Sequence, residues 1–338
     1  METYAGIDLH SSNNFIGVID STDKRLYGKR HSNRLADVLG ALDPFKQSLK
    51  GVVVESTFNW YWLVDGLQDH GYQVHLANPS AMKQYEGLKH TDDQWDSFWL
   101  THMYRLNLLA EGYIYPREHR ALRDLLRRRL LYVRQRTAQI LSLQSMISRN
   151  LGFKMSNNEI KKLAAQDIAQ LFDCPDLVFM AANSWTTIEF LKQIIRGIEK
   201  RVVSQARLRK EFTKLQTIPG IGKILALTIM LEVGDIGRFA TVGDYSSYCR
   251  CVESKKISNG KKKGENNKKN GNKYLAWAYV EAANFAKRYC PKAQSFYQSK
   301  KAKTKNVVAI KALSNKLSRA SYYIMRDQVA FDEDKLFS

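Results

Sequence analysis

The chain has 338 residues, enough for two or three domains, and a formal net charge of +20 at pH 7. The charge is uneven: residues 1–115 hold 10 Lys and Arg against 14 Asp and Glu, and the basic excess follows them, which indicates a cation-binding module joined to modules that bind phosphate. Because no run reaches about 18 apolar residues and no signal-peptide pattern is present, we exclude an integral membrane or exported protein and expect a soluble, cytoplasmic one.

The first third of the chain alternates strand-like and helix-like patterns. Short apolar runs predict strands, and periodic apolar residues predict helices at residues 60–70 and 80–87. The strands are expected at residues 4–9, 14–20, 24–30, 51–55 and 72–77. Strands joined first by hairpins and later by crossover helices predict an α/β domain with a mixed sheet and helices on its faces.

Acidic residues end two of the predicted central strands. Asp8 lies at the end of the first strand, and Glu55 closes the uninterrupted apolar run that precedes it. Such a run is typical of a central buried strand. Because neighbouring central strands of a mixed sheet can end at one edge, we expect these two carboxylates to lie close together.

A third group of acids stands on a predicted helix near residues 92–106. Asp93 and Asp96 share a helix face at a spacing of three residues, and Asp92 and Asp96 share one at a spacing of four. Periodicity does not decide between Asp92 and Asp93, although it places Asp92 slightly nearer the buried side. The inward face it predicts consists of Trp95, Phe98, Trp99, His102 and Leu106.

These carboxylates together suggest a metal site. Four acids in one cluster repel one another unless cations neutralise them, and oxygen ligands suit Mg²⁺, with Mn²⁺ as the alternative. Metal ions held about 3.5–4 Å apart stabilise the attacking and leaving oxygens of phosphoryl transfer. A strand-end Asp, a strand-end Glu and a helical Asp pair, in this order, resemble the ribonuclease-H-like nucleases of the RuvC type.

From Arg117 the chain becomes basic and helical. Apolar stripes predict a helix of more than 30 residues from Arg117 and a second at residues 186–216, with a less regular insertion at 151–185. The two stripes indicate an antiparallel helical hairpin or an intermolecular coiled coil. Eight arginines between Arg117 and Arg136 crowd the first helix, where they form either a solvated face or a contact with phosphate or RNA.

A Pro-Gly-Ile-Gly sequence at residues 219–222 precedes an apolar helix. It resembles the hairpin of helix-hairpin-helix modules, in which glycines expose backbone N–H groups to a phosphate. A tight turn between packed helices is equally compatible with these residues. Two further helices are predicted at residues 274–289 and 306–326.

Residues 255–273 form a strongly basic segment with eight lysines, five asparagines and three glycines. Low hydrophobicity and like charge oppose collapse, so we expect a loop that becomes ordered only on a polyanion. Apolar segments flank it, which places it inside a domain. Ser258 in this loop is a candidate hydroxyl nucleophile for chemistry on a nucleic-acid backbone, and a solvated basic linker is the alternative interpretation.

Several common enzyme signatures are missing from the sequence. The chain has no P-loop and no GxGxxG after a strand, which argues against ATP or dinucleotide use, and no GxSxG nucleophile elbow. His10, His90 and His102 show no spacing that marks a general base. The four cysteines form no CxxC pair, so we expect reduced, mostly buried thiols rather than a zinc site.

Five blocks of the sequence, at residues 5–10, 54–56, 88–129, 218–239 and 258–286, carry a resemblance that covers nearly the whole length. They resemble the transposases of the bacterial insertion sequence 110 family, in particular its 1111 subgroup. The resemblance implies a RuvC-like metal-binding catalytic domain at residues 1–115 and a helical coiled-coil region with an insertion at 116–216. It also implies a mostly α-helical C-terminal transposase domain at 217–338.

The resemblance further implies which residues form the site. The family's Asp-Glu-Asp-Asp metal-binding tetrad maps to Asp8, Glu55, Asp93 and Asp96. Asp93 is preferred over Asp92 because the family motif is Asp-x-x-Asp. The catalytic serine of a Ser-x-Gly motif maps to Ser258, with Ser254 as the weaker candidate. Relatives often carry Ala at the position of Ser97, a small change that we expect metal binding to tolerate.

Members of this family recombine DNA under guidance by a structured RNA from the element's non-coding end. The resemblance therefore implies an RNA-guided DNA transposase that uses Mg²⁺ and a guide RNA and binds donor and target DNA. We expect a dimer or tetramer that associates with the nucleoid when acting, with Ser258 and the tetrad meeting either within one protomer or between two. The alternatives are a RuvC-like nuclease that uses water and a non-enzymatic nucleic-acid scaffold.

Overall fold

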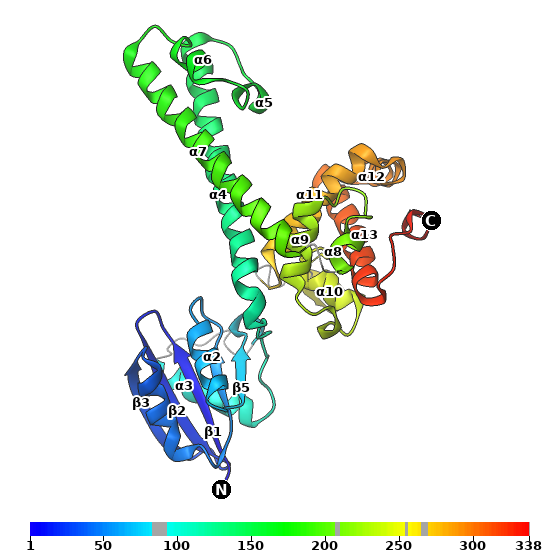
Figure 1. The fold of residues 1–338 in the computed structure, drawn as a ribbon. Helices are drawn as coiled ribbons and strands as arrows, with labels where there is room; N and C mark the ends of the chain where they lie inside the picture. The colour runs from blue at the N-terminus through cyan, green and yellow to red at the C-terminus, as the bar shows by residue number, and fades with distance from the viewer. Residues whose placement is uncertain (83–92, 207–209, 254–255, 265–269, 338) are drawn as a thin grey trace. The chain divides into compact units, whose positions relative to one another are not determined.

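The computed structural model describes residues 1–82, 93–206, 210–253, 256–264 and 270–337 (Figure 1). Asp92, Ser254 and most of the helix predicted at residues 80–87 lie outside the described residues. The described chain forms two compact units. The N-terminal unit spans Met1–Arg117, and the C-terminal unit spans Glu118–Gly264 and continues from Gly271.

The N-terminal unit contains the predicted mixed sheet. Its five strands lie in the order β3-β2-β1-β4-β5. The first three pair antiparallel, whereas β4 runs parallel to β1 and β5 parallel to β4. The strands are β1 (Thr3–Leu9), β2 (Asn13–Asp20), β3 (Arg25–Ser32), β4 (Leu49–Glu55) and β5 (Val74–Ala77). The unit is thus a ribonuclease-H-like α/β domain, which confirms the predicted fold class.

Helices cover both faces of this sheet (Figure 1). On one face Ile7, Val18 and Val54 share a core with helices α1 (Leu35–Leu42) and α2 (Tyr61–Asp69). The other face lies against α3 (Asp93–Arg105), which contacts β1, β2 and β4. Two short 3₁₀ turns complete the described unit at Asp43–Phe45 and Pro79–Ala81. Because side chains alternate along a strand, Asp8 and Glu55 belong to the face that α3 covers.

A row of glycines brings α3 close to the sheet. Gly6, Gly17 and Gly28 stand in register on β1, β2 and β3. A Cβ atom at Gly6 would lie 2.4 Å from the backbone oxygen of Ser97, and one at Gly17 would lie 2.5 Å from Ser97 Oγ. Ser97 Oγ donates a hydrogen bond of 3.2 Å to the Gly6 carbonyl. Helix α3 therefore packs directly against the strand backbone at these glycines.

The buried face of α3 differs from the predicted one. Ser97, Leu100 and Thr101 are fully buried, whereas Trp95 and Trp99 are only half-buried and Leu106, just after the helix, is 42% exposed. Of the residues predicted to face inward, only Phe98 is buried. The prediction followed hydrophobicity, but the glycine row leaves room for small side chains. One turn before Ser97 and Leu100, this arrangement points Asp93 and Asp96 toward the sheet.

We expect Gly6→Ala to destabilise the N-terminal unit by about 1–3 kcal/mol, because the new methyl group meets helix backbone that cannot move aside easily. Gly40→Ala in α1 is the matched control, since a Cβ atom there meets nothing within 4 Å. Thermal unfolding followed by circular dichroism measures both variants. Equal melting temperatures for the two would show that α3 does not depend on the glycine row.

The C-terminal unit contains the predicted antiparallel helical hairpin of α4 (Arg117–Leu151) and α7 (Pro175–Ala206). Near the base, Arg129 of α4 pairs with Glu199 of α7 at 2.6 Å. Toward the tip, Ile140 and Ile147 of α4 share a core with Ile188 of α7. Two short helices lie at the tip, α5 (Asn157–Ile160) and α6 (Ala165–Ala169).

The predicted bounds of the second long helix are wrong. The prediction was residues 186–216, but α7 begins at Pro175 and ends at Ala206, and a separate α8 (Lys210–Leu215) follows. Much of the predicted irregular insertion is therefore helix. Pro175 occupies the first helical position, where its missing N–H is harmless, and Ala181 continues the apolar stripe in the tip core.

The remaining helices share one hydrophobic core, in which α9 (Lys223–Val233) is buried along most of its length. Gly220, in the turn before α9, has a φ of +84°, and a Cβ atom there would lie 2.2 Å from the Ala282 carbonyl of α11. This turn thus packs directly on another helix. The elements are α9 (Lys223–Val233), a 3₁₀ turn (Ile236–Arg238), α10 (Val242–Tyr248), α11 (Lys273–Tyr289), α12 (Pro291–Lys303), α13 (Asn306–Asp327) and α14 (Glu333–Phe337). None of the described helices is both long and apolar enough to cross a membrane.

Candidate active site

Asp8 and Glu55 meet at the carboxyl ends of two parallel strands. Ile7 on β1 lies opposite Val54 on β4, so the next residue of each strand is Asp8 or Glu55. Asp8 is only 2% exposed. The two carboxyl groups share a hydrogen bond. The sheet thus brings two of the predicted tetrad residues into direct contact.

The first turn of α3 adds Asp93 and Asp96 to this edge. Asp93 Oδ1 lies 3.2 Å from Nε2 of His10, which in turn lies 3.0 Å from Asp8 Oδ2. The negative charge of Asp96 is close enough to raise the pKa of Glu55. All four carboxylates of the predicted tetrad therefore gather at one edge of the domain.

The electrostatics of this edge show that the carboxylates crowd one another. Burial, a hydrogen bond to Asp8 and the charges of Asp8 and Asp96 together raise the pKa of Glu55 to about 8. Glu55 thus carries a proton at neutral pH when no cation is bound, and it donates that proton to Asp8. A site that holds a proton among several carboxylates has the charge to hold a cation in its place.

We expect the metal-free N-terminal unit to lose stability as pH rises from about 4.5 to about 8. Above 4.5 the unfolded chain releases the Glu55 proton that the folded state retains up to about 8, so the stabilisation is complete only below that window. Added Mg²⁺ should then raise the melting temperature more at the upper end of the window than at the lower end. Glu55→Gln, which cannot titrate, should flatten the pH profile recorded in EDTA. If the melting temperature of the wild-type protein in EDTA did not change with pH over this window, that result would contradict the crowding of the carboxylates.

His10 is a member of the cluster that periodicity did not single out. Its Nε2 atom lies between Asp8 and Asp93, and the three side chains form a group whose ligand atoms all lie within 4.8 Å of one another. Its backbone carbonyl accepts hydrogen bonds from the side-chain amides of Asn33 and Asn59 at 3.0 and 2.9 Å, which fixes its position. The available signal was its place two residues after a strand-end Asp.

Arg30 also reaches the cluster, from β3. Its guanidinium donates to Asp93 Oδ2 at 2.5 Å. Arg30 thus offsets part of the negative charge of the acids. Asp8 Oδ2, although near His10, is buried without a well-formed hydrogen bond among the described residues. A buried carboxylate oxygen without a donor, beside three further carboxylates, fits a divalent cation.

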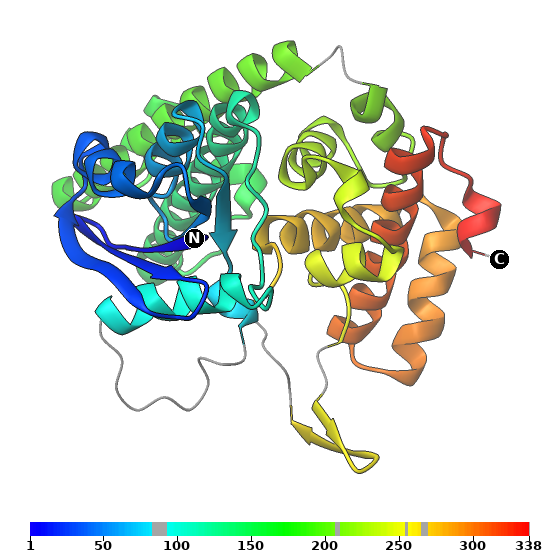
Figure 2. The same cartoon turned by 90° about the horizontal axis from the view of Figure 1, so that it is seen from below.

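Ser258 belongs to the C-terminal unit, on a β-hairpin. Strand β6 (Lys256–Ser258) pairs antiparallel with β7 (Lys261–Gly264), and Figure 2 shows this hairpin extending away from the helices of its unit. Asn259 and Gly260 form the two-residue turn with φ of 48° and 70°. Ser258 is exposed, directly before the turn.

The expectation of a structureless loop over residues 255–273 is therefore wrong for its described first half. Asn-Gly is the strongest short-range signal of a hairpin, because both residues adopt positive φ in a type I′ turn. The high lysine content obscured that signal in the sequence, because lysine-rich segments favour disorder.

The cysteines were expected to be reduced and mostly buried. Three of the four are buried, Cys249, Cys251 and Cys290, and Cys174 is exposed.

The two ends of the basic segment are held together at its base. Arg250 donates from Nε and Nη2 to the Gly271 carbonyl, 21 residues away, at 3.1 and 2.8 Å. The Asn272 N–H donates to the Tyr248 carbonyl at 2.6 Å. These contacts hold together the chain segments that precede and follow the hairpin carrying Ser258.

The arginines of α4 are partly used inside the protein. Arg127 forms two hydrogen bonds of 2.7 Å with Glu232 of α9, and Arg129 pairs with Glu199. Arg120 and Arg123 are buried. These four side chains therefore do not form the wholly solvated face that was one of the two alternatives.

The sheet order and the acidic edge define an α/β protein of the ribonuclease-H-like class. Residues 5–151 match the family model described as "Transposase" for the DEDD transposases of IS110, and residues 213–298 match the "Transposase IS116/IS110/IS902 family". The two matches together cover more than half of the chain, which belongs to the IS110 family of transposases. It is an enzyme that acts on DNA. No curated protein matches the chain significantly.

Proposed function

We propose that this transposase cuts and exchanges DNA strands through Ser258, with Mg²⁺ held by Asp8, Glu55, Asp93 and Asp96, under guidance by RNA. The observation that carries the proposal is the convergence of the four carboxylates on one edge of the ribonuclease-H-like sheet. The match to DEDD transposases supports the use of divalent metal.

The acidic edge supplies the electrostatic part of the chemistry. Bound there, a divalent cation would polarise the scissile phosphate and offset the charge that develops during phosphoryl transfer. Asp8 is the residue that we expect to contribute most to cation binding, since it is buried and contacts both Glu55 and His10. Arg30, which pairs with Asp93, is placed to bind a phosphate oxygen at the same edge.

Ser258 supplies the nucleophile. Its Oγ attacks the scissile phosphorus, the Oγ–P bond forms, the P–O bond to the neighbouring nucleotide breaks, and that nucleotide leaves with a hydroxyl group. The serine proton passes to solvent, and the leaving oxygen takes a proton from solvent to become that hydroxyl group. Attack on the phosphoserine by a hydroxyl of the partner strand then restores the serine and completes the exchange. Since one phosphodiester replaces another, no ATP is needed, in keeping with the missing P-loop.

Sequence specificity, in this proposal, comes from base pairing with a structured RNA of the element, and two duplexes are held by a dimer or tetramer. The basic excess after residue 115 supports binding of several phosphate backbones. Nuclease treatment of the purified complex tests the RNA directly. Loss of strand cleavage after ribonuclease, with recovery when the element's transcript is added back, is the expected result, and full activity after ribonuclease would contradict it.

A protein–DNA adduct tests the serine chemistry. Labelled donor and target DNA are incubated with the protein, RNA and Mg²⁺ and run on denaturing gels. We expect an adduct band that Ser258→Ala abolishes and that the matched control Ser254→Ala retains. Cleavage without an adduct, unchanged in Ser258→Ala, would instead indicate a nuclease that uses water.

A further inference from the structure

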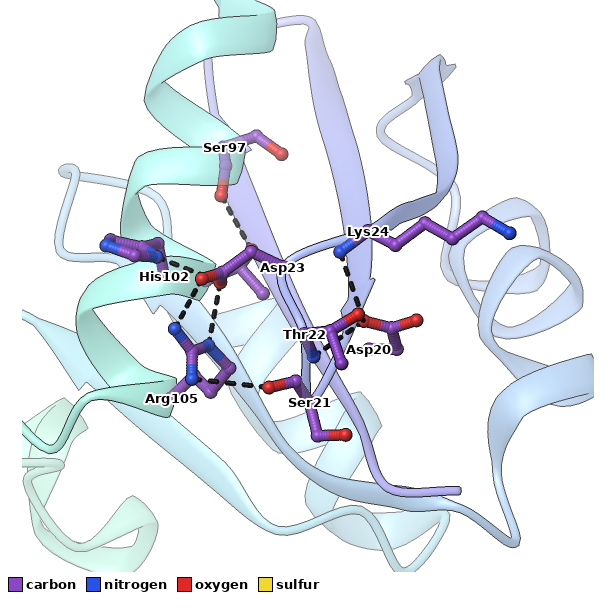
Figure 3. Close-up of polar contacts among 9 residues, drawn as sticks. Asp20, Ser21, Thr22, Asp23, Lys24, Ser97, His102 and Arg105 are labelled. Atoms are coloured by element: carbon purple, nitrogen blue, oxygen red, sulfur yellow. Dashed lines mark hydrogen bonds and ion pairs between the residues drawn. The ribbon is translucent and has the colours of Figure 1, made fainter.

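A cavity of about 230 Å³ lies on the N-terminal unit beside α3, away from the acidic edge. Its lining comes from the outer side of α3 and from the β2–β3 hairpin, whose turn Figure 3 shows next to His102 and Arg105. The lining residues are Ile19, Asp23, Arg25, Trp95, Phe98, Trp99 and His102. The volume is below the roughly 300–1,000 Å³ of sites for drug-sized molecules, so it suits a smaller ligand.

Aromatic rings dominate this lining. Trp95 and Trp99 stack with centroids 5.0 Å apart and 16° between their planes, and Trp99 and His102 stack at 5.8 Å and 30°. The three rings lie one turn apart along α3, at positions that are only half-buried. Large aromatic residues that are stacked in a row and left partly open to solvent resemble the platforms on which nucleobases stack.

The hairpin beside α3 holds this row in place. Asp20 Oδ1 accepts from the backbone N–H groups of Thr22 and Lys24 at 2.7 and 3.0 Å and so closes the turn (Figure 3). Asp23 at the tip, with φ of 65°, pairs with His102 Nδ1 at 2.9 Å and accepts from Arg105 Nε at 2.7 Å. The His102 ring is thus fixed by contacts independent of the acidic edge.

A β-bulge directs Arg25 toward the cavity. Val18 pairs with Tyr27 but Ile19 pairs with Arg25, so one residue of β3 is extra at this point. Without the bulge Arg25 would point to the opposite face of the sheet, because side chains alternate. With it, the Arg25 guanidinium lies 4.3 Å from the Phe98 ring centroid.

The same face of β3 connects the cavity to the acidic edge. Arg25 stands at the cavity, and Arg30, five residues along the strand, pairs with Asp93 of the tetrad. At about 3.3 Å per residue, the backbone positions of the two arginines are at most roughly 16 Å apart along the strand, and the bulge shortens this separation. A nucleic-acid backbone that follows β3 would therefore have phosphates near both arginines.

We propose that this cavity binds one unpaired nucleobase of the DNA or RNA strand whose backbone follows β3 into the acidic edge. The base lies against the Trp95–Trp99–His102 row, and Arg25 binds the adjoining phosphate. The cavity thus fixes a strand a few nucleotides from the phosphate that reacts. The proposal rests on the proposed function only in placing a strand at the tetrad.

Photo-crosslinking of the full chain in EDTA tests the proposal without scoring cleavage or adduct formation. Single-stranded DNA and RNA oligonucleotides carrying one 5-iodouracil are irradiated with the protein, which is then digested with trypsin. We expect crosslinks in the peptide of residues 90–105, which contains the aromatic row. The nucleic acid, DNA or RNA, that gives the higher yield identifies the strand.

Two variants with equal loss of charge make this test specific. Arg25→Ala should lower the yield of that crosslink by about fivefold or more, through the lost phosphate and ring contacts. Lys29→Ala on the same strand should leave the yield unchanged, because Lys29 pairs with Ile16 on the opposite face. Crosslinks that map only to the C-terminal unit, or equal losses in both variants, would overturn the proposal. Failure of the serine–metal mechanism would leave this crosslink intact.

Discussion

Asp8→Asn is expected to lower strand cleavage by about 10³-fold or more while the protein stays folded. The substitution keeps the size of a side chain that is 2% exposed but removes the charge at the centre of the tetrad. Asp8 contacts both Glu55 and His10 and so lies at the centre of the cluster. Loss of one electrostatic group at a phosphoryl-transfer site removes several kcal/mol of transition-state stabilisation.

Asp20→Asn is the matched control for this prediction. Asp20 is equally buried, at 3% exposed, but lies opposite Thr3 at the other end of β1, where it closes the β2–β3 turn. Its amide replacement keeps the acceptor oxygen, so cleavage should change little. Gel-based cleavage rates at saturating Mg²⁺ compare the two variants. Equal activity of Asp8→Asn and Asp20→Asn would mean that the acidic edge does not catalyse the reaction.

The second large effect is expected on stability, from Glu232→Ala. Glu232 is 3% exposed and accepts two hydrogen bonds of 2.7 Å from Arg127 and a third of 2.7 Å from the Asn272 side chain. Removing it leaves a mostly buried guanidinium and an amide without their acceptor. Breaking a buried pair in this way destabilises a protein by about 3–5 kcal/mol.

The Glu232→Ala substitution should also weaken the contacts at the base of the basic segment. Asn272 caps α11 by accepting from the N–H groups of Tyr274 and Leu275, and it follows the residue that Arg250 holds. Urea unfolding followed by circular dichroism measures the effect. Glu189→Ala is the control, since its pair with Lys192 on the surface of α7 contributes only about 0.3–0.5 kcal/mol. Similar losses in the two variants would show that the Glu232 network is not a stabilising element.

The topology of the N-terminal unit could be predicted because it is written in local patterns. Hairpin-linked strands and an uninterrupted apolar strand ending in Glu55 each occupy one stretch of sequence, as does the basic helix from Arg117 in the C-terminal unit. Asp8 and Glu55 could be placed together because parallel neighbours end at one edge. These inferences need no knowledge of how distant segments pack.

The features that escaped prediction depend on register between distant segments. Gly6, Gly17 and Gly28 form a row only once three strands are aligned, and that row, rather than hydrophobicity, decides which side of α3 is buried. The bulge that turns Arg25 toward α3 is likewise a property of paired strands. The hairpin at Asn259 and Gly260 is different: its signal was local and was outweighed by the surrounding lysines.

The most direct test of the account is to identify the residue that is covalently joined to DNA. The adduct is digested with trypsin and nuclease, and the modified peptide is sequenced by mass spectrometry. Cleavage after Lys256 and Lys261 releases residues 257–261, whose single serine is Ser258, whereas Ser254 falls in the peptide of residues 251–255. We predict a nucleotide on the first peptide. A nucleotide on the second peptide, or on any residue other than Ser258, would contradict the proposed role of the hairpin serine.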